Sequence, residues 1–295
     1  MRLATFNLLH GQPVTDSHTI GGAGPSLDAK SIDLPTFTDV GPLRKAVEDL
    51  NPDVLGLQEV DVHQPRSGGH HQVREIAEAL DAPFWRFVPT VRGTPGARST
   101  FAAASTADIE EAANSDADFG PRYGIGMVSR VPILSWQVKL FEPSRIPLPL
   151  LVQTGGRPRF LKVSDEPRAA IAVEIELDGI VVTVATVHLS FVPGRNVRQL
   201  RQLRHWLVNL PRPLILMGDF NLPGVLPRIV SGYSQIVSQP TYPSYKPRVQ
   251  FDHLLTDGIS ETNNDAMRRS VRVQHLGVSD HCAVAVDIDQ LRQQG

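Results

Sequence analysis

A short apolar run that ends in two polar residues is the feature of this sequence that most constrains its fold. Leu214-Ile215-Leu216-Met217 leads directly into Gly218-Asp219-Phe220-Asn221. Side chains at i and i+2 of a strand share a face, so Asp219 and Asn221 are expected to project together from a strand end. A buried carboxylate is costly without a partner, and converging oxygen donors suit a magnesium-like cation or a phosphate ester. The alternative is an Asx turn without chemistry.

The same pattern recurs elsewhere in the chain. Other apolar runs end at or adjoin Asn7, Gln58-Glu59, His188, Asp252-His253 and Ser279-Asp280-His281. Folds of the α/β class place their chemistry at the ends of otherwise apolar strands. The recurrence therefore predicts that both ends of the chain contribute to one site, and hence a single domain over residues 1–295.

Together these motifs resemble the endonuclease/exonuclease/phosphatase superfamily, which includes deoxyribonuclease-I-like nucleases, sphingomyelinases and inositol-polyphosphate 5-phosphatases. The resemblance runs from Thr5 to about Asp287, with the motifs in the family's order. It implies an α/β four-layer sandwich of two mixed β-sheets flanked by helices. It also implies a hydrolase of phosphate esters that depends on Mg²⁺ or Mn²⁺ and takes a phosphodiester or a phosphomonoester.

Local patterns agree with such a fold. Apolar spacing predicts amphipathic helices over 43–50, 73–80 and 197–210. Asp178-Gly179, between two β-branched runs, predicts a hairpin and therefore some antiparallel pairing. Three inserts, 12–40, 92–122 and 141–167, are expected to be loops, binding elements or lids. Within the second, we expect 102–118 to be a disordered loop rather than a short helix.

Composition is ordinary for a globular enzyme. A hydrophobic content of 41% permits a sizeable core, and a net charge of −2 gives no general attraction to nucleic acid or to an anionic membrane. The single cysteine, Cys282, excludes an intramolecular disulfide and is expected to be a buried apolar residue. No stretch is apolar enough to span a bilayer, and Asn7 is too close to the start for a cleaved signal. These features predict a cytoplasmic protein without an integral membrane segment.

The resemblance implies roles for the metal ligands and for the groups that act on water. Glu59 is expected to bind the metal with help from Asn7, and Asp280 is expected to complete or adjoin that site. A histidine titrates near neutrality, which suits His281 to act as general base or as a donor to the phosphate. The family orients this histidine with an aspartate at the position of Asp252.

Further roles concern the ester itself. Asp219 is expected to position or deprotonate the attacking water, and Asn221 to hold the phosphate or the transition state. His188 is followed by Leu189 rather than forming the Asn-x-Tyr pattern of abasic-site nucleases. It is expected to be a general acid or a phosphate ligand.

Two residues have a less specific signal. Arg168 matches an arginine of many relatives and is expected either to contact the phosphate or to form a surface ion pair with Glu166 or Asp165. Tyr123 stands where relatives keep a residue on the substrate side. His253 is excluded because it should face away from Asp252. The other histidines are expected in solvated loops or on exposed helix faces, namely His10, His18, His63, His70, His71, His205 and His275.

The substrate of the expected phosphodiesterase or phosphatase is left unassigned, and three possibilities stay open. A nuclease would use the basic ridge Arg195, Arg198, Arg201 and Arg204, although a solvated helix face is the favoured interpretation. A membrane lipid headgroup would need an apolar loop such as 146–152. A catalytically silent binding module would have no need of all eight of Asn7, Glu59, His188, Asp219, Asn221, Asp252, Asp280 and His281.

Overall fold

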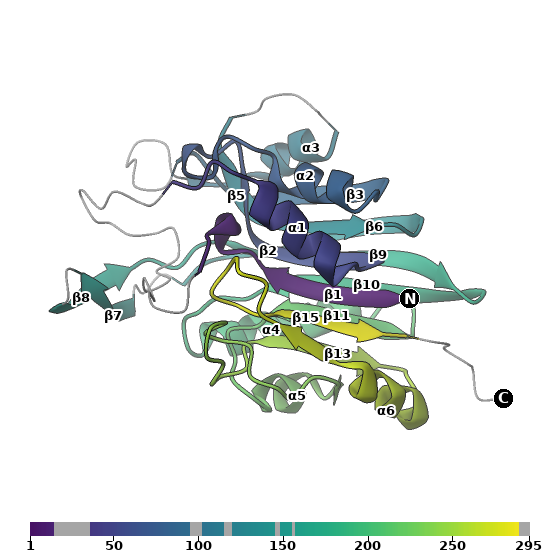
Figure 1. Cartoon of the computed structure of the whole chain (residues 1–295). Coiled ribbons are helices and arrows are strands. Elements are labelled where there is room, and N and C mark those ends of the chain that lie inside the picture. Colours follow the sequence, from purple (N-terminus) through teal and green to yellow (C-terminus); the bar gives the residue numbers. More distant parts are fainter. Residues whose placement is uncertain (15–35, 95–101, 115–119, 145–147, 155–156, 289–295) are drawn as a thin grey trace.

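Two β-sheets pack face to face and carry helices on their outer faces (Figure 1). The computed structural model describes residues 1–14, 36–94, 102–114, 120–144, 148–154 and 157–288. The seven-stranded sheet has the order β14 (Arg272–Gln274), β15 (Ala283–Asp287), β1 (Arg2–Asn7), β2 (Val54–Val62), β5 (Arg122–Ser129), β3 (Phe84–Arg92) and β4 (Ala102–Ala103). The six-stranded sheet has the order β12 (Ser234–Gln235), β13 (Asp252–Asp257), β11 (Leu214–Asp219), β10 (Ile180–His188), β9 (Arg168–Leu177) and β6 (Ile133–Phe141).

The helices are α1 (Gly41–Leu50), α2 (Gln72–Ala79), α3 (Thr106–Asn114), α4 (Arg195–Leu207), α5 (Leu226–Ser231) and α6 (Glu261–Ser270), with two 3₁₀ turns, η1 (Leu9–Gly11) and η2 (Pro65–Ser67). Buried side chains of α1 and α2 join one apolar cluster with the outer face of the seven-stranded sheet. Leu200, Leu203 and Leu207 of α4 join another with the outer face of the six-stranded sheet. A third cluster, which includes Met127 and Met217, fills the space between the sheets. The predicted four-layer α/β sandwich is confirmed.

Each sheet contains one parallel pair of strands, and the other pairs that the structure describes are antiparallel. In the seven-stranded sheet β1 and β2 run parallel, which aligns Asn7 with Gln58. In the six-stranded sheet β10 and β11 run parallel, which aligns His188 with Asp219. A helix joins the strands of each pair, α1 in the first and α4 in the second. The carboxyl ends of four strands therefore bring polar side chains to one end of the sandwich.

The predicted helices and the hairpin are confirmed with small changes in their bounds. Helices α1 and α2 bury the expected apolar positions. Helix α4 ends at Leu207 rather than at Leu210, because Pro211 and Pro213 follow and disfavour helical backbone before them. Asp178 and Gly179 both have positive φ, as a tight turn between β9 and β10 requires.

The insert expected to be a disordered loop over 102–118 contains α3, so that prediction was wrong. Ile109 and Ala112 are buried one turn apart, which anchors the helix to the body. Ser105 and Asp108 also cap its start, because the Asp108 carboxylate accepts from the Ser105 backbone and hydroxyl. The buried pair Ile109 and Ala112 and the cap formed by Ser105 and Asp108 therefore stabilise a helix in this segment.

The insert 141–167 forms an antiparallel hairpin of β7 (Leu148–Thr154) and β8 (Arg157–Val163), which projects from the two sheets (Figure 1). The run considered for lipid contact, 146–152, lies partly in β7; residues 145–147 and the side chains of the hairpin are outside the described part. Residues 15–35 of the first insert, with His18, are outside it as well.

Two histidines differ from their predicted environment. His10, expected in a solvated loop, lies in η1 and is partly buried, and burial holds the pKa of its ring well below 6.5. His71, expected in a solvated loop, is buried, accepts a hydrogen bond from the backbone of Arg74 at the start of α2, and packs edgewise on Trp85 and Phe87. Its ring supplies both a helix cap and apolar surface, which a sequence pattern does not reveal. Cys282 is buried, as expected. Among the described residues, no helix combines the length and apolarity needed to cross a membrane. A cytoplasmic location stays a prediction.

Candidate active site

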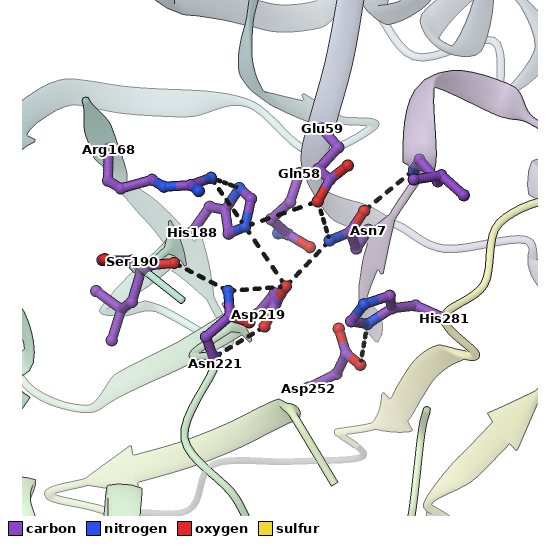
Figure 2. A network of polar contacts seen from close by, with 12 residues as sticks. Asn7, Gln58, Glu59, Arg168, His188, Ser190, Asp219, Asn221, Asp252 and His281 are labelled. Atoms are coloured by element: carbon purple, nitrogen blue, oxygen red, sulfur yellow. Dashed lines mark hydrogen bonds and ion pairs between the residues drawn. The ribbon is translucent and has the colours of Figure 1, made fainter. Parts of the chain in front are cut away.

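Strand β2 is bent within its length, at Gln58 and Glu59, before its last three residues pair again with β5. The pairing of β2 with β5 shifts register between Leu57 and Val60, and Glu59 has φ 55°. A regular strand would point Gln58 and Glu59 to opposite faces, whereas this bulge re-aims the second side chain. Glu59 therefore points toward Asn7 and His188 (Figure 2), while the Gln58 side chain next to it contacts Thr5 and Thr186. The positive φ of a glutamate is costly and is typical of functional sites.

Gln58 fixes the separation of the two sheets beside the site. Its amide nitrogen donates to the hydroxyl of Thr186 at 2.9 Å and lies 3.0 Å from the Thr5 hydroxyl. All three side chains are fully buried. Gly56, two residues earlier, permits the close approach, because a Cβ there would lie 2.4 Å from the Thr186 hydroxyl oxygen. This contact joins β2 of one sheet to β10 of the other.

The end of β11 supplies the second carboxylate. Asp219 is buried, and its Oδ2 accepts a hydrogen bond of 3.0 Å from the amide nitrogen of Asn7. Its Oδ1 accepts from the backbone N–H of Asn221, which has φ 48°. The sequence left an Asx turn and a functional site as alternatives for Asp219 and Asn221. In the structure these residues form the Asx turn and also lie in the candidate site. Burial, opposed by His281, raises the pKa of Asp219 to about 7.

Asn7 lies between the two carboxylates. Its amide nitrogen donates to Asp219 and also, at 3.1 Å, to Glu59 Oε1, while its amide oxygen accepts from the backbone N–H of Leu9. Asn7 is thereby a bridge between β2 and β11. To present its oxygen to a cation, the amide would have to turn over and give up the bond to Leu9.

His188 lies at the centre of this group (Figure 2). Its Nε2 is 3.5 Å from Asp219 Oδ2 and 3.9 Å from Glu59 Oε1, and Arg168 Nη1 lies 3.0 Å from its Nδ1 and 3.1 Å from its Nε2. Burial, reinforced by the charge of Arg168, holds the pKa of His188 well below its usual value. The ring is therefore neutral near pH 7, and a lone pair can accept a hydrogen bond or bind a cation.

Arg168 is buried, which excludes the surface ion pair considered for it. Its guanidinium reaches His188 and comes within 4.0 Å of Asp165. Its Nε has no partner within the described part of the chain. Tyr123 is also buried, its hydroxyl has no partner among the described residues, and burial raises its pKa well above 10.0. Both residues therefore offer uncommitted donors.

The opposite side holds a histidine and its carboxylate. His281 Nδ1 lies 2.8 Å from Asp252 Oδ2. Burial lowers the pKa of His281, but Asp252 outweighs it through charge and a hydrogen bond and keeps this pKa well above 6.5. Ser279 positions the segment, since its hydroxyl donates to the carbonyl of Asn7 and accepts from the backbone of His281. His253 faces the other way, against Phe220, as strand alternation predicted.

These side chains meet in one pocket of about 610 Å³. Eight of the ten predicted site residues line it, namely Glu59, Tyr123, Arg168, His188, Asp219, Asn221, Asp280 and His281. Asn7 and Asp252 are fully buried and hydrogen-bonded to members of that set. The structure thus gathers all ten, although they come from both sheets and from both ends of the chain.

The donor set fits a divalent cation. Oxygen and nitrogen atoms of Glu59, His188 and Asp219 lie within 4.8 Å of one another, and Glu59 Oε2 is buried without a partner in the described part. Burial raises the pKa of Asp280, on the same pocket wall, to about 6. Crowded, buried carboxylates with a free oxygen are what a hard cation satisfies. The geometry differs from the predicted ligand set, because it adds His188 and Asp219 and turns the oxygen of Asn7 away.

Several residues of the site had no role predicted for them. Gln58 and Ser279 stood in recognised motifs, but their hydrogen bonds between elements needed the fold to be seen. Asn196 of α4 donates to the carbonyl of Asn221 and holds the loop after β11. Glu166 is buried, neither of its carboxylate oxygens has a partner among the described residues, and burial raises its pKa to about 7.

Arg198, Arg201 and Arg204 are exposed on α4, as a solvated helix face requires.

Comparison with solved structures shows the same fold at low identity. A family protein from Beutenbergia cavernae is 18% identical with a TM-score of 0.53, covering 97% of this chain and 70% of its own. One from Bacteroides thetaiotaomicron is 14% identical with a TM-score of 0.54, covering 100% and 98%. A mannosyl-6-phosphatase from the same species is 14% identical with a TM-score of 0.50, covering 97% of this chain and 98% of its own.

No curated protein matches the sequence. The sequence itself matches the Endonuclease/Exonuclease/phosphatase family over residues 4–281, nearly its whole length. The match includes all ten predicted site residues, from Asn7 to His281. The chain therefore belongs to the Endonuclease/Exonuclease/phosphatase family.

Proposed function

We propose that this protein hydrolyses phosphate esters with the help of a divalent cation, Mg²⁺ or Mn²⁺, as a phosphodiesterase or a phosphatase. The observation that supports it most is the pairing, across one pocket, of buried carboxylates on one side with the His281–Asp252 pair on the other. Hydrolysis of a phosphate ester needs groups that accept a proton from water and groups that stabilise negative charge on phosphorus. The pocket contains both.

Glu59 is the principal residue that would hold the cation. Asp280, Asp219 and His188 would adjoin it. Asn7, the predicted amide ligand, would contribute its oxygen if its side chain turns over. When bound, such a cation would neutralise negative charge on the phosphoryl oxygens. The unpartnered Glu59 Oε2 and the raised pKa of Asp280 support this assignment. The Asn7 amide nitrogen donates to both Glu59 and Asp219 and so supplies partial positive charge to both carboxylates.

The two sides of the pocket divide the proton chemistry between them. The carboxylate of Asp219 lines the pocket and is placed to take a proton from the attacking water. His281 is protonated near neutral pH, so its Nε2–H is the group that donates to a phosphoryl oxygen or to the leaving oxygen. Of the two roles predicted for His281, donation therefore agrees better with its environment than general-base action.

The phosphoryl group would bind between these residues. Arg168 supplies a permanent positive charge, and Tyr123 and Asn221 supply neutral polar groups on the same wall. Arg168 Nη1 lies 3.0 Å from His188 Nδ1, and the single lone pair of the neutral ring either accepts this N–H or binds the cation. The mannosyl-6-phosphatase with this fold agrees with a phosphomonoester as one class of substrate.

A nuclease is the second candidate. The first turn of α4 lines the pocket at Asn196 and Val197, and the same helix exposes Arg198, Arg201 and Arg204 farther along. A nucleic-acid backbone that leaves the pocket along α4 would meet these charges.

Turnover assays with and without chelator test the proposal. The protein is stripped with EDTA, and hydrolysis of an aryl phosphodiester, an aryl phosphomonoester, plasmid DNA and RNA is followed while Mg²⁺ or Mn²⁺ is added back. We expect activity that depends on the cation, and a preference among the substrates that separates small-ester hydrolase from nuclease. Absence of hydrolysis on every substrate would favour the catalytically silent binding module instead.

A further inference from the structure

The pocket has a second surface that the hydrolytic chemistry does not use. Besides the polar side chains, its lining includes Phe191, Val197, Leu222, Leu226, Tyr242 and Phe251. Hereafter we call these six residues the apolar wall. They come from three segments, the turn after β10 with α4, the segment after β11 with α5, and the loop that precedes β13. An apolar surface assembled from three segments around a polar site is typical of a binding site for an organic group.

The apolar wall is contiguous with the catalytic residues on both sides. The ring of Tyr242 lies 5.1 Å from that of His281 and 5.6 Å from that of Phe251. On the other side the Arg168 guanidinium stands 5.9 Å from the ring of Phe191. A group packed on this wall would therefore be adjacent to a phosphate held by Arg168 and His281.

Among the six residues of the apolar wall, Leu226 gives the clearest indication of an apolar ligand. It is 40% exposed on α5 yet lines the pocket, so its side chain keeps apolar surface in contact with solvent. Such surface is stabilised when an apolar ligand covers it. Ile229 on the same short helix is 64% exposed but does not line this pocket. Leu226 and Ile229 are both exposed apolar residues of α5, but only Leu226 lines this pocket, which makes Ile229 a matched control.

Positive charge in the pocket is limited. In the part of the chain that the structure describes, Arg168 is the single lysine or arginine among the lining residues. A polyanion such as an inositol polyphosphate or a nucleic acid gains affinity from several such contacts. The positive charge of one arginine together with a cation suffices to bind one phosphoryl group.

We propose that the substrate of this site is an ester with a single phosphoryl group whose apolar or aromatic organic part packs on the apolar wall. This inference rests on the proposed function, since it takes the polar side of the pocket as the phosphate site. It places inositol polyphosphates and nucleic acids among the poor ligands. It also makes Leu226 a residue that determines specificity.

Binding of non-hydrolysable phosphonates tests this independently of turnover. Affinities of methylphosphonate and phenylphosphonate are measured by calorimetry on the whole chain with Mg²⁺ present. We expect phenylphosphonate to bind about tenfold tighter or more, because the phosphonate is shared and only the apolar group differs. Leu226→Gln should reduce this preference at least about threefold, whereas Ile229→Gln should leave it unchanged.

The outcomes separate the two proposals. Equal affinity for the two phosphonates, or stronger competition by inositol hexakisphosphate or a short DNA duplex than by phenylphosphonate, would overturn the substrate class. The same holds if Ile229→Gln and Leu226→Gln lower the preference equally. A clear preference for the phenyl group, without hydrolysis of any ester, would instead overturn the proposed hydrolase and leave the ligand class standing.

Discussion

His281 Nδ1 and Asp252 Oδ2 lie 2.8 Å apart, although His281 precedes β15 of the seven-stranded sheet and Asp252 begins β13 of the six-stranded sheet. Asp252 is fully buried, and its second carboxylate oxygen has no partner among the described residues. The pair therefore raises the pKa of His281 and also links the two sheets through a hydrogen bond. Its removal should affect the chemistry more than the fold.

Asp252→Asn should lower kcat by about 10²- to 10⁴-fold, because a neutral amide neither orients the ring nor stabilises its protonated form. Steady-state kinetics and cation titration measure the effect, and the affinity for the cation should stay close to wild type. Asp257→Asn, at the other end of β13 and 38% exposed, is the matched control. Equal kcat for Asp252→Asn and wild type would contradict the assigned pairing.

His281→Ala and Asp219→Ala should each abolish turnover and leave the fold intact. The buried carboxylate of Asp219 has a raised pKa of about 7, which means that its charged form is disfavoured by its surroundings, so truncation should not destabilise the protein severely. Circular dichroism and thermal unfolding check the fold, and product assays check turnover. A wild-type rate from His281→Ala would refute the donor assignment.

Glu59→Gln should raise the cation concentration needed for half-maximal activity by about tenfold or more, since the amide has lost the negative charge that a hard cation prefers. The readout is activity against Mg²⁺ or Mn²⁺ concentration, together with direct calorimetric titration of the cation. Glu176→Gln, on an exposed position of β9, serves as control. An unchanged cation requirement would show that Glu59 is not a ligand.

Gln58→Leu should lower the free energy of unfolding by about 1–3 kcal/mol, because the buried hydroxyls of Thr5 and Thr186 lose their partner. Urea unfolding at pH 7 measures it. In the triple variant Thr5→Val, Gln58→Leu, Thr186→Val, no polar group is left unpaired, so much of the loss should be recovered. If the triple variant is less stable than the single one, the hydrogen bonds are not the cause.

His253 should make the protein sensitive to acid. Burial lowers its pKa from 6.5 to about 4, so the neutral form is favoured in the folded state. Its contribution to stability is complete above the unfolded pKa and is lost as pH falls from 6.5 through 4. At pH 4.5 the loss is about 2–3 kcal/mol relative to pH 7. In His253→Gln, which can still donate to the carbonyl of Leu222, unfolding free energies should fall less over this range. An identical decline in both proteins would assign the acid sensitivity to other groups.

The sandwich and the roles of the site residues followed from the resemblance to the family, whereas local patterns predicted individual helices, strand ends and one hairpin. Strand period places Asp219 at a strand end, and the turn at Asp178-Gly179 fixes β9 against β10. Amphipathic spacing likewise found α1 and α2. These signals are local, because each depends on residues within a few positions of one another.

What could not be predicted depends on contacts between distant segments. The bulge that turns Glu59 toward the site is a backbone conformation that opposes its residue type. The orientation of the Asn7 amide is decided by Leu9 on one side and Asp219 on the other. Tyr242 of the apolar wall lies in a loop with no periodic signal, and its neighbour His281 comes from another sheet.

The division of the site between two parallel strand pairs has a consequence for how activity is acquired. Neither sheet alone holds more than half of the catalytic groups, since β1 and β2 contribute Asn7 and Glu59, while β10 and β11 contribute His188 and Asp219. If the proposed hydrolysis is correct, a chain whose two sheets had formed without packing on each other would contain β-structure but would lack turnover. During refolding, the recovery of turnover should then lag behind the recovery of β-structure.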